Sequence, residues 1–142
     1  MSILKDVEAA AEWMARALQS SGYQAEFSVA SLWEVERFFV EHSVRGEARP
    51  GGMLTEQLGE RLFGLGSYVG EVIRRSAGGT WAAEDDDPDI EVNVRLELDD
   101  GTTIFPVQRA MKRLWNGTQD SMVDYGSDLG LDLQSGPPPS SN

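Results

Sequence analysis

The chain has 142 residues, of which 40% are hydrophobic and 25% charged, and this is the size and composition of one ordinary globular domain. It contains no cysteine, which excludes disulfides, cysteine nucleophiles and thiolate-bound metals. The formal net charge of −12 disfavours contact with nucleic-acid phosphates and anionic membranes, so we expect neither as a partner.

His42 is the only histidine, which excludes a histidine-rich metal site and HExxH chemistry. No GxSxG sequence accompanies it, so a serine–histidine triad is not predicted, and a surface or capping role is more typical of a lone histidine near a helix end. The sequence therefore predicts no cofactor and no metal site.

The N-terminus lacks the apolar stretch of a signal peptide, and no segment approaches the ~20 apolar residues of a membrane span. Together with the absence of cysteine, this predicts a cytoplasmic location.

The first two predicted elements are helices. Apolar residues at helical spacing run from Ile3 to Leu18, with Ser2 placed to cap the start and Gly22 the end. Ser31 and Glu34 have the spacing of a capping box, which predicts a second helix from Ser31 to about His42.

A loop is predicted from Arg45 to Gly52, where one proline and three glycines interrupt the chain. A long helical pattern follows from about Leu54 to Arg75. Four glycines interrupt it, and each costs about 1 kcal/mol relative to alanine inside a helix. Either tertiary packing offsets this cost or the helix breaks near Gly64. Gly66 and Gly70 share one face, which would let the backbone of another element come close.

The second half of the chain has the pattern of a small sheet. Apolar and polar residues alternate from Ile90 to Leu98, which predicts a strand with one buried face. The turn sequence Asp99-Asp100-Gly101 predicts that Thr102 to Phe105 returns as an antiparallel partner. A third strand is predicted at Thr80 to Ala83.

Pro106 suits the first turn of a helix that reaches about Trp115, and a helical turn is predicted near Ser121 to Tyr125. The order of elements predicts an α+β fold, in which N-terminal helices pack on one face of a small antiparallel sheet of about three strands, followed by a C-terminal helix. We expect residues 1–133 to form a single domain and the proline-rich residues 134–142 to form a disordered tail.

Residues from about 26 to 125 resemble a family of small bacterial proteins that has no assigned activity. The similar segments are SLWEVERFFVEHS (31–43), PGGML (50–54), LFGLGSYVGEVIRR (62–75), GGTW (78–81), DPDIEVNV (87–94) and FPVQRAMKRLWNGTQDSM (105–122). Gln119 departs from the pattern of that family, in which an acidic residue often stands there. The resemblance implies a bacterial origin and no particular chemistry.

Two motifs have simpler explanations than a ligand site. Gly64, Gly66 and Gly70 superficially resemble a dinucleotide fingerprint, but the residues before them are helical in pattern, whereas that motif requires a strand. The acidic run from Glu84 to Glu91 resembles the start of a calcium loop, but it lacks the required glycine and the terminal glutamate, so we interpret it as a solvated loop.

Glu71 is a candidate catalytic acid, in a pocket with Arg109 and Trp81. An ion pair on the helix surface with Arg74 or Arg75 is the simpler interpretation, because these residues follow Glu71 by three and four positions.

The main candidate binding site is a polar helix face of Arg109, Lys112, Arg113 and Asn116. These residues either pair internally with the acidic loop or the polar strand face, or anchor an acidic partner or a phosphate-bearing ligand. An exposed Trp81 or Trp115 beside them would add a contact anchor.

The sequence thus favours a non-enzymatic acidic protein that binds another protein, as immunity proteins and secretion chaperones do. The alternative is an enzyme or a small-ligand-binding protein that uses a pocket of Glu71 and Arg109.

Overall fold

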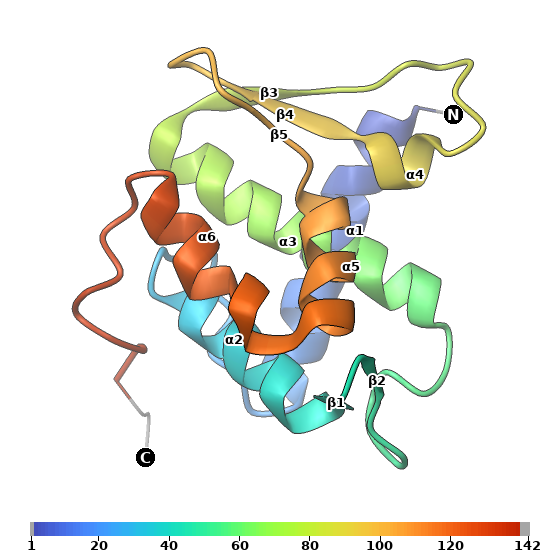
Figure 1. Ribbon diagram of the computed structural model, residues 1–142. Helices are drawn as coiled ribbons and strands as arrows, with labels where there is room; N and C mark the ends of the chain where they lie inside the picture. The colour runs from blue at the N-terminus through green and yellow to red at the C-terminus, as the bar shows by residue number, and fades with distance from the viewer. Residues whose placement is uncertain (1, 140–142) are drawn as a thin grey trace.

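A computed structural model describes residues 2–139, in which α-helices are combined with two small antiparallel sheets (Figure 1). The elements, in chain order, are α1 (Ile3–Ser20), α2 (Ser31–His42), β1 (Ser43–Val44), β2 (Glu47–Ala48), α3 (Leu58–Ala77), β3 (Gly79–Ala82), α4 (Ile90–Asn93), β4 (Arg95–Leu98), β5 (Thr103–Ile104), α5 (Pro106–Asn116), the 3-10 helix η1 (Gly117–Asp120) and α6 (Met122–Asp128). The three-stranded sheet has the order β3-β4-β5 and lies across one end of the helices (Figure 1). This arrangement confirms the predicted α+β fold.

The long helix α3 is the centre of the molecule, and it packs against α1, α5 and the sheet. It continues through Gly64, Gly66 and Gly70 without a break, and all three glycines are buried. A Cβ atom at Gly66 would lie 2.5 Å from the Cα of Val107, and one at Gly70 would overlap the ring of Trp81. The predicted close approach of another element is therefore confirmed, with the start of α5 at Gly66 and Trp81 at Gly70.

The sheet register follows the predicted turn. In the β4–β5 pair Leu96 faces Ile104, and in the β3–β4 pair Trp81 faces Leu96. These three side chains are all buried, so the core-facing side of the sheet lies against the helices.

The predicted strand from Ile90 to Leu98 is wrong in its first half. Residues 90–93 form the short helix α4, and the extended backbone begins only at Val94. The Asp87 side chain accepts hydrogen bonds from the Asp89 N–H at 2.8 Å and from Asn93 Nδ2 at 2.8 Å. These two bonds close a turn around Pro88 and hold the short helix α4. This local structure replaces the strand that the alternating pattern predicts for residues 90–93.

The predicted capping box at Ser31 is also wrong, although α2 begins there. Ser31 is the first helical residue and is fully buried, and its hydroxyl donates to the Ser28 carbonyl and lies 2.7 Å from the Tyr68 hydroxyl. Glu34 accepts instead from the Gln24 N–H at 2.9 Å. Both side chains of the expected box are therefore used by tertiary contacts.

Two further segments differ from the simple sequence pattern. The predicted loop from Arg45 to Gly52 contains β2 and the turn of the β1–β2 hairpin, at Arg45 and Gly46. At the other end of the chain, Leu133 is buried, and its carbonyl accepts a hydrogen bond from Trp33 Nε1 at 3.0 Å. The predicted boundary at residue 133 and the disordered tail stay predictions, and residues 140–142 lie outside the described residues.

The glycine face of α3 can be tested with a matched pair of variants. Gly66→Ala is expected to lower the free energy of unfolding by about 1–3 kcal/mol, because the added methyl group meets the backbone of α5. Gly59 lies in the same helix, and a Cβ atom added there would have no heavy atom within 4 Å. Gly59→Ala is therefore expected to raise the free energy of unfolding by up to about 1 kcal/mol. Urea unfolding of the two variants measures both effects, and equal effects would contradict the close packing.

Candidate functional site

Helix α5 presents one buried face and one outer face. Its buried residues are Pro106, Val107, Ala110, Arg113 and Leu114, and they pack toward α3 and the core. At 3.6 residues per turn the opposite face carries Phe105, Gln108, Arg109, Lys112, Trp115 and Asn116. The predicted polar face is therefore divided, because Arg113 belongs to the buried side.

Arg113 is a structural residue that is 2% exposed. Its Nε atom donates to both carboxylate oxygens of Glu36 at 2.9 Å, and its Nη2 atom lies 2.8 Å from Oε2. Glu36 also accepts from the Met122 N–H at 3.0 Å. This buried ion pair joins α5 to α2 and to the first residue of α6, so the charge of Arg113 is used inside the fold and is not free for a partner.

Arg109 and Asn116 also have internal partners. Arg109 Nη2 donates to the Ser121 carbonyl at 3.0 Å, its Nη1 lies 3.7 Å from Asp120 Oδ1, and its guanidinium covers the Tyr125 ring. Asn116 Nδ2 donates to Asp120 Oδ2 at 2.7 Å. The internal pairing that the sequence suggested does occur, but with Glu36 and Asp120 rather than with the acidic loop or the sheet.

Lys112 is the one cation of the predicted face that is exposed and has no ion pair within residues 2–139. It lines a hollow of about 220 Å³ together with Arg109, Phe105 and Tyr125. No carboxylate lines this hollow, so its walls carry net positive charge on a chain that is strongly negative.

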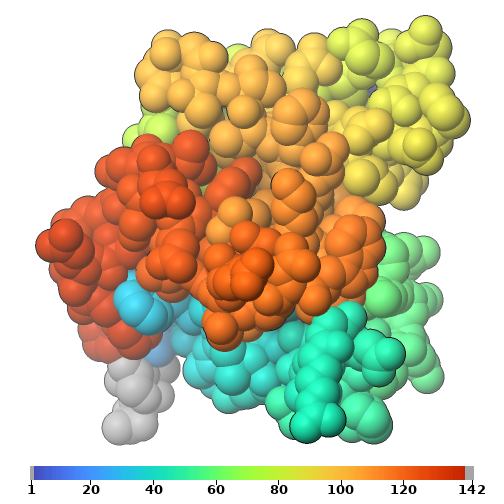
Figure 2. Space-filling view, viewed as in Figure 1, coloured from blue at the N-terminus to red at the C-terminus, as the bar shows by residue number. Residues whose placement is uncertain are grey.

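An exposed apolar surface lies at the other end of α5. We call it the Trp115 patch, and it consists of Val40, Val44 and Trp115, which are 49%, 39% and 57% exposed. The β1–β2 hairpin lies directly against this end of α5, and a Cβ atom at Gly46 would lie 3.0 Å from the Trp115 carbonyl oxygen. Figure 2 shows the hairpin in teal beside α5 in orange.

The Trp115 patch has a hollow and a basic rim. Val40, Val44 and the buried Leu114 line a hollow of about 210 Å³ between α2, the hairpin and α5. Arg45 lines the same hollow, and Lys112 precedes Trp115 by three residues on the outer face of α5. Neither cation has an ion pair among the described residues. Sequence reasoning named Trp115 only as a conditional anchor and missed the valines, because α2 and α5 meet only in the folded chain.

Glu71 and Trp81 form a buried cluster of their own. Glu71 is 3% exposed, and its carboxylate accepts from Arg74 Nε at 2.6 Å and from Trp81 Nε1 at 2.8 Å. Burial raises the pKa of Glu71, but the hydrogen bonds from Arg74 and Trp81 outweigh burial and hold this pKa below its ordinary value.

Glu71 forms the predicted ion pairs with Arg74 and Arg75, but its carboxylate is buried and does not lie on the helix surface as predicted. Glu71 and Arg109 have different polar partners, so the structure does not assemble the predicted pocket from them. Trp81 is buried beneath the sheet and is not a contact anchor.

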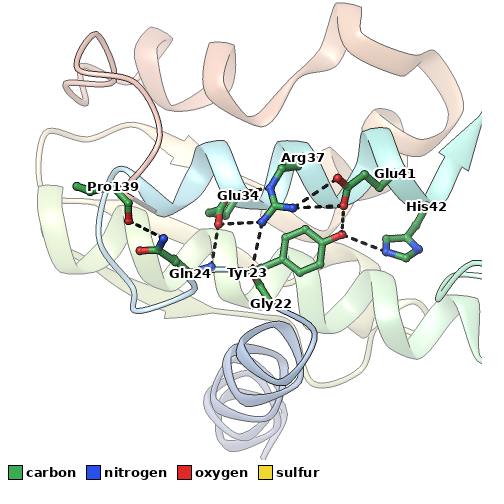
Figure 3. Close-up of polar contacts among 8 residues, drawn as sticks. All are labelled: Gly22, Tyr23, Gln24, Glu34, Arg37, Glu41, His42 and Pro139. Carbon is green, nitrogen blue, oxygen red and sulfur yellow. Dashed lines mark hydrogen bonds and ion pairs between the residues drawn. The ribbon is translucent and has the colours of Figure 1, made fainter. Parts of the chain in front are cut away.

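His42 belongs to a polar network at the C-terminal end of α2 (Figure 3). Its Nδ1 atom accepts from the Met53 N–H at 3.1 Å, and its Nε2 atom lies 3.1 Å from the Tyr23 hydroxyl, which also bonds Glu41. Arg37 bridges Glu41 and Glu34 on the same helix. Because Nδ1 is an acceptor here, the imidazole is held neutral, and desolvation lowers the pKa of His42. The network fastens the chain segments around Tyr23 and Met53 to α2.

Neither a cluster of metal-ligating side chains nor a membrane-spanning helix is found among the described residues. Within residues 2–139 no group of three or more histidine, aspartate or glutamate side chains is placed to hold a metal ion, and this includes the acidic run from Glu84 to Glu91. None of the helices described is long and apolar enough to cross a membrane.

Comparison with protein-family models, with curated proteins and with solved structures finds no match to this chain. The resemblance to a family of small bacterial proteins therefore stays a prediction.

The division of α5 into two faces can be tested with neighbouring cations. Arg113→Gln is expected to lower the free energy of unfolding by about 3–5 kcal/mol, because it leaves the partly buried Glu36 carboxylate without its cation. Lys112→Gln is expected to change it by less than about 0.5 kcal/mol, because Lys112 is exposed. Chemical denaturation measures both, and similar losses for the two variants would contradict the assignment.

The His42 network predicts a pH dependence of stability. The pKa of His42 is lower in the folded chain than the value of about 6.5 in the unfolded chain, so the unfolded state binds the additional proton first. The contribution of neutral His42 to the free energy of unfolding is therefore expected to be complete above about pH 6.5. It is expected to fall as the pH drops below this value. His42→Asn keeps an acceptor for the Met53 N–H and cannot titrate. Urea unfolding between pH 7.5 and 5.5 should show a weaker pH dependence for this variant, and parallel profiles would contradict the prediction.

Proposed function

We propose that this protein is a non-enzymatic protein-binding domain of the cytoplasm, and that it binds an acidic partner through the Trp115 patch and the adjacent cations. The observation that supports this most directly is the exposure of Trp115, at 57%, at the end of α5 against which the β1–β2 hairpin lies, together with Val40 and Val44, which are each more than one third exposed. Tryptophan in an exposed apolar cluster is the residue type most enriched among the energetic anchors of protein interfaces.

The shape of the patch favours a partner that inserts a side chain. The hollow of about 210 Å³ between Val40, Val44 and Leu114 has largely apolar walls, although Arg45 and Arg113 also line it. The exposed Trp115 follows Leu114 directly in α5. A hollow of this size suits one apolar side chain better than a whole small ligand, because ligand pockets usually measure about 300–1,000 Å³. We therefore expect a partner residue such as leucine or phenylalanine in the hollow.

The charges around the patch favour an acidic partner. Arg45 and Lys112 have no internal ion pair within residues 2–139, so their charge is available to a carboxylate. The chain as a whole carries −12, but charges beyond the Debye length of roughly 8 Å are screened at physiological ionic strength. Arg45 and Lys112 therefore act on a partner at this end of the molecule together with the exposed carboxylate of Glu47, which faces Val44 in the hairpin.

An immunity-like or chaperone-like adaptor is the kind of protein that this surface suits. The enzymatic alternative with Glu71 and Arg109 is less favoured, because the carboxylate of Glu71 is fully occupied by Arg74, Arg75 and Trp81. The net charge disfavours nucleic acid and anionic membranes as partners of this chain.

Site-specific photo-crosslinking tests the proposal. A photoreactive phenylalanine analogue at position 115, in cells that express the chain, is expected to capture a distinct protein partner, whereas the same analogue at the exposed Trp13 is not. With that partner purified, Trp115→Ala is expected to weaken binding by about 30-fold, the loss typical of an interface anchor, and Lys112→Gln to weaken it less and to reduce its salt dependence.

Thermal unfolding of both variants serves as the control, because each changes an exposed residue and should leave the fold intact. Equal affinity of Trp115→Ala and the unchanged chain for the captured partner would contradict the proposed surface.

A further inference from the structure

A second hollow lies on a different part of the molecule, between α1, the first turn of α3 and α4. It measures about 350 Å³ and includes none of the residues of the Trp115 patch. Trp13 of α1, which is 50% exposed, and Phe63 of α3 form its aromatic walls. This volume lies at the small end of the range of about 300–1,000 Å³ for ligand pockets, so a ligand enclosed here would be small.

Arg61 lines this hollow, and one of its hydrogen-bond donors has no acceptor. Its Nε atom is shielded from water and has no hydrogen-bond partner, and Arg61 forms no ion pair within residues 2–139. A buried donor without an acceptor is unfavourable, and a guanidinium edge is the best side-chain partner for a carboxylate. A ligand carboxylate bound to the guanidinium would supply the missing acceptor.

The backbone near Arg61 also favours a negative group. Gln57, which lines the hollow, precedes α3 and provides no side-chain cap for the first N–H groups of the helix. The N-terminal end of a helix carries a partial positive charge that adds to the charge of Arg61. The two features together point to a ligand carboxylate at this end of the hollow.

Two exposed carboxylates line the same hollow. Glu60 and Glu91 lie on α3 and α4, and no ion pair of either with Arg61 is formed. These two groups would repel a simple anion but attract a ligand that also carries an ammonium group. The aromatic and charged side chains that line the hollow are therefore two aromatic rings, a cation for a carboxylate and two anions for an ammonium group.

We propose that this hollow binds a free α-amino acid with an aromatic or bulky apolar side chain. The side chain lies against Trp13 and Phe63, the carboxylate bonds Arg61, and the ammonium group lies beside Glu60 and Glu91. This inference does not depend on the proposed protein-binding function, because the two sites share no residue.

Isothermal titration calorimetry with L-phenylalanine and three analogues tests each group of the site. L-phenylalanine is expected to bind, whereas L-phenylalaninamide lacks the carboxylate, 3-phenylpropionate lacks the ammonium and L-alanine lacks the ring. Each analogue is expected to bind at least about 10-fold more weakly than L-phenylalanine, which corresponds to the loss of one good polar or apolar contact. L-leucine serves as the bulky apolar comparison and is expected to bind.

Two variants and a control locate the site on the chain. Arg61→Gln breaks no internal ion pair, so it should fold normally and lose at least about 10-fold in affinity for L-phenylalanine. Trp13→Ala is expected to lose a similar amount, whereas Trp115→Ala should bind as the unchanged chain does. A shift of the Trp13 indole N–H signal in an NMR titration would confirm the location.

Three results would overturn the proposal. The first is the absence of heat and of NMR shifts with L-phenylalanine and L-leucine at millimolar concentration. The second is equal binding of 3-phenylpropionate and L-phenylalanine, which would mean that the ammonium group is not recognised. The third is unchanged affinity of folded Arg61→Gln.

Discussion

The close contact between α3 and the start of α5 is the constraint on which the rest of the structure depends. Gly66 lets the backbone of Val107 approach α3, and Gly70 makes room for the ring of Trp81. This places β3 and α5 on the same side of α3, so the sheet and the last long helix share one core. A side chain at either glycine would separate these elements by the thickness of a methyl group or more.

The orientation of α5 follows from this contact and from the Arg113–Glu36 ion pair. The glycine contact sets the N-terminal end of the helix, and the ion pair attaches its C-terminal half to α2 and α6. With both attachments made, the opposite face of α5 must point to solvent. Trp115 and Lys112 are exposed for this geometric reason, and the hairpin after α2 brings Val44 and Arg45 to the same end.

Polar networks complete the attachment of the irregular segments. Tyr23, Glu41 and His42 hold the connection after α1 against α2 (Figure 3). His42 also accepts a hydrogen bond from the loop at Met53. Asp87 closes the turn before α4 with two hydrogen bonds. The first network joins residues that are 11 to 19 positions apart in the sequence, whereas the second is local to residues 87–93.

The sequence by itself determined the helices other than α4 and η1, the turn at Asp99–Gly101 and the close approach at Gly66 and Gly70 of α3, because these depend on local periodicity and on backbone sterics. Only the tertiary structure decided which charged residues are free. Arg113 and Lys112 are adjacent on one helix, yet one is buried against Glu36 and the other is exposed. The Trp115 patch and the Arg61 hollow were likewise decided by the packing of α2 on α5 and of α1 on α3. Helical spacing assigns a residue to a face of its own helix, but burial and ion pairing are set by whichever element packs on that face.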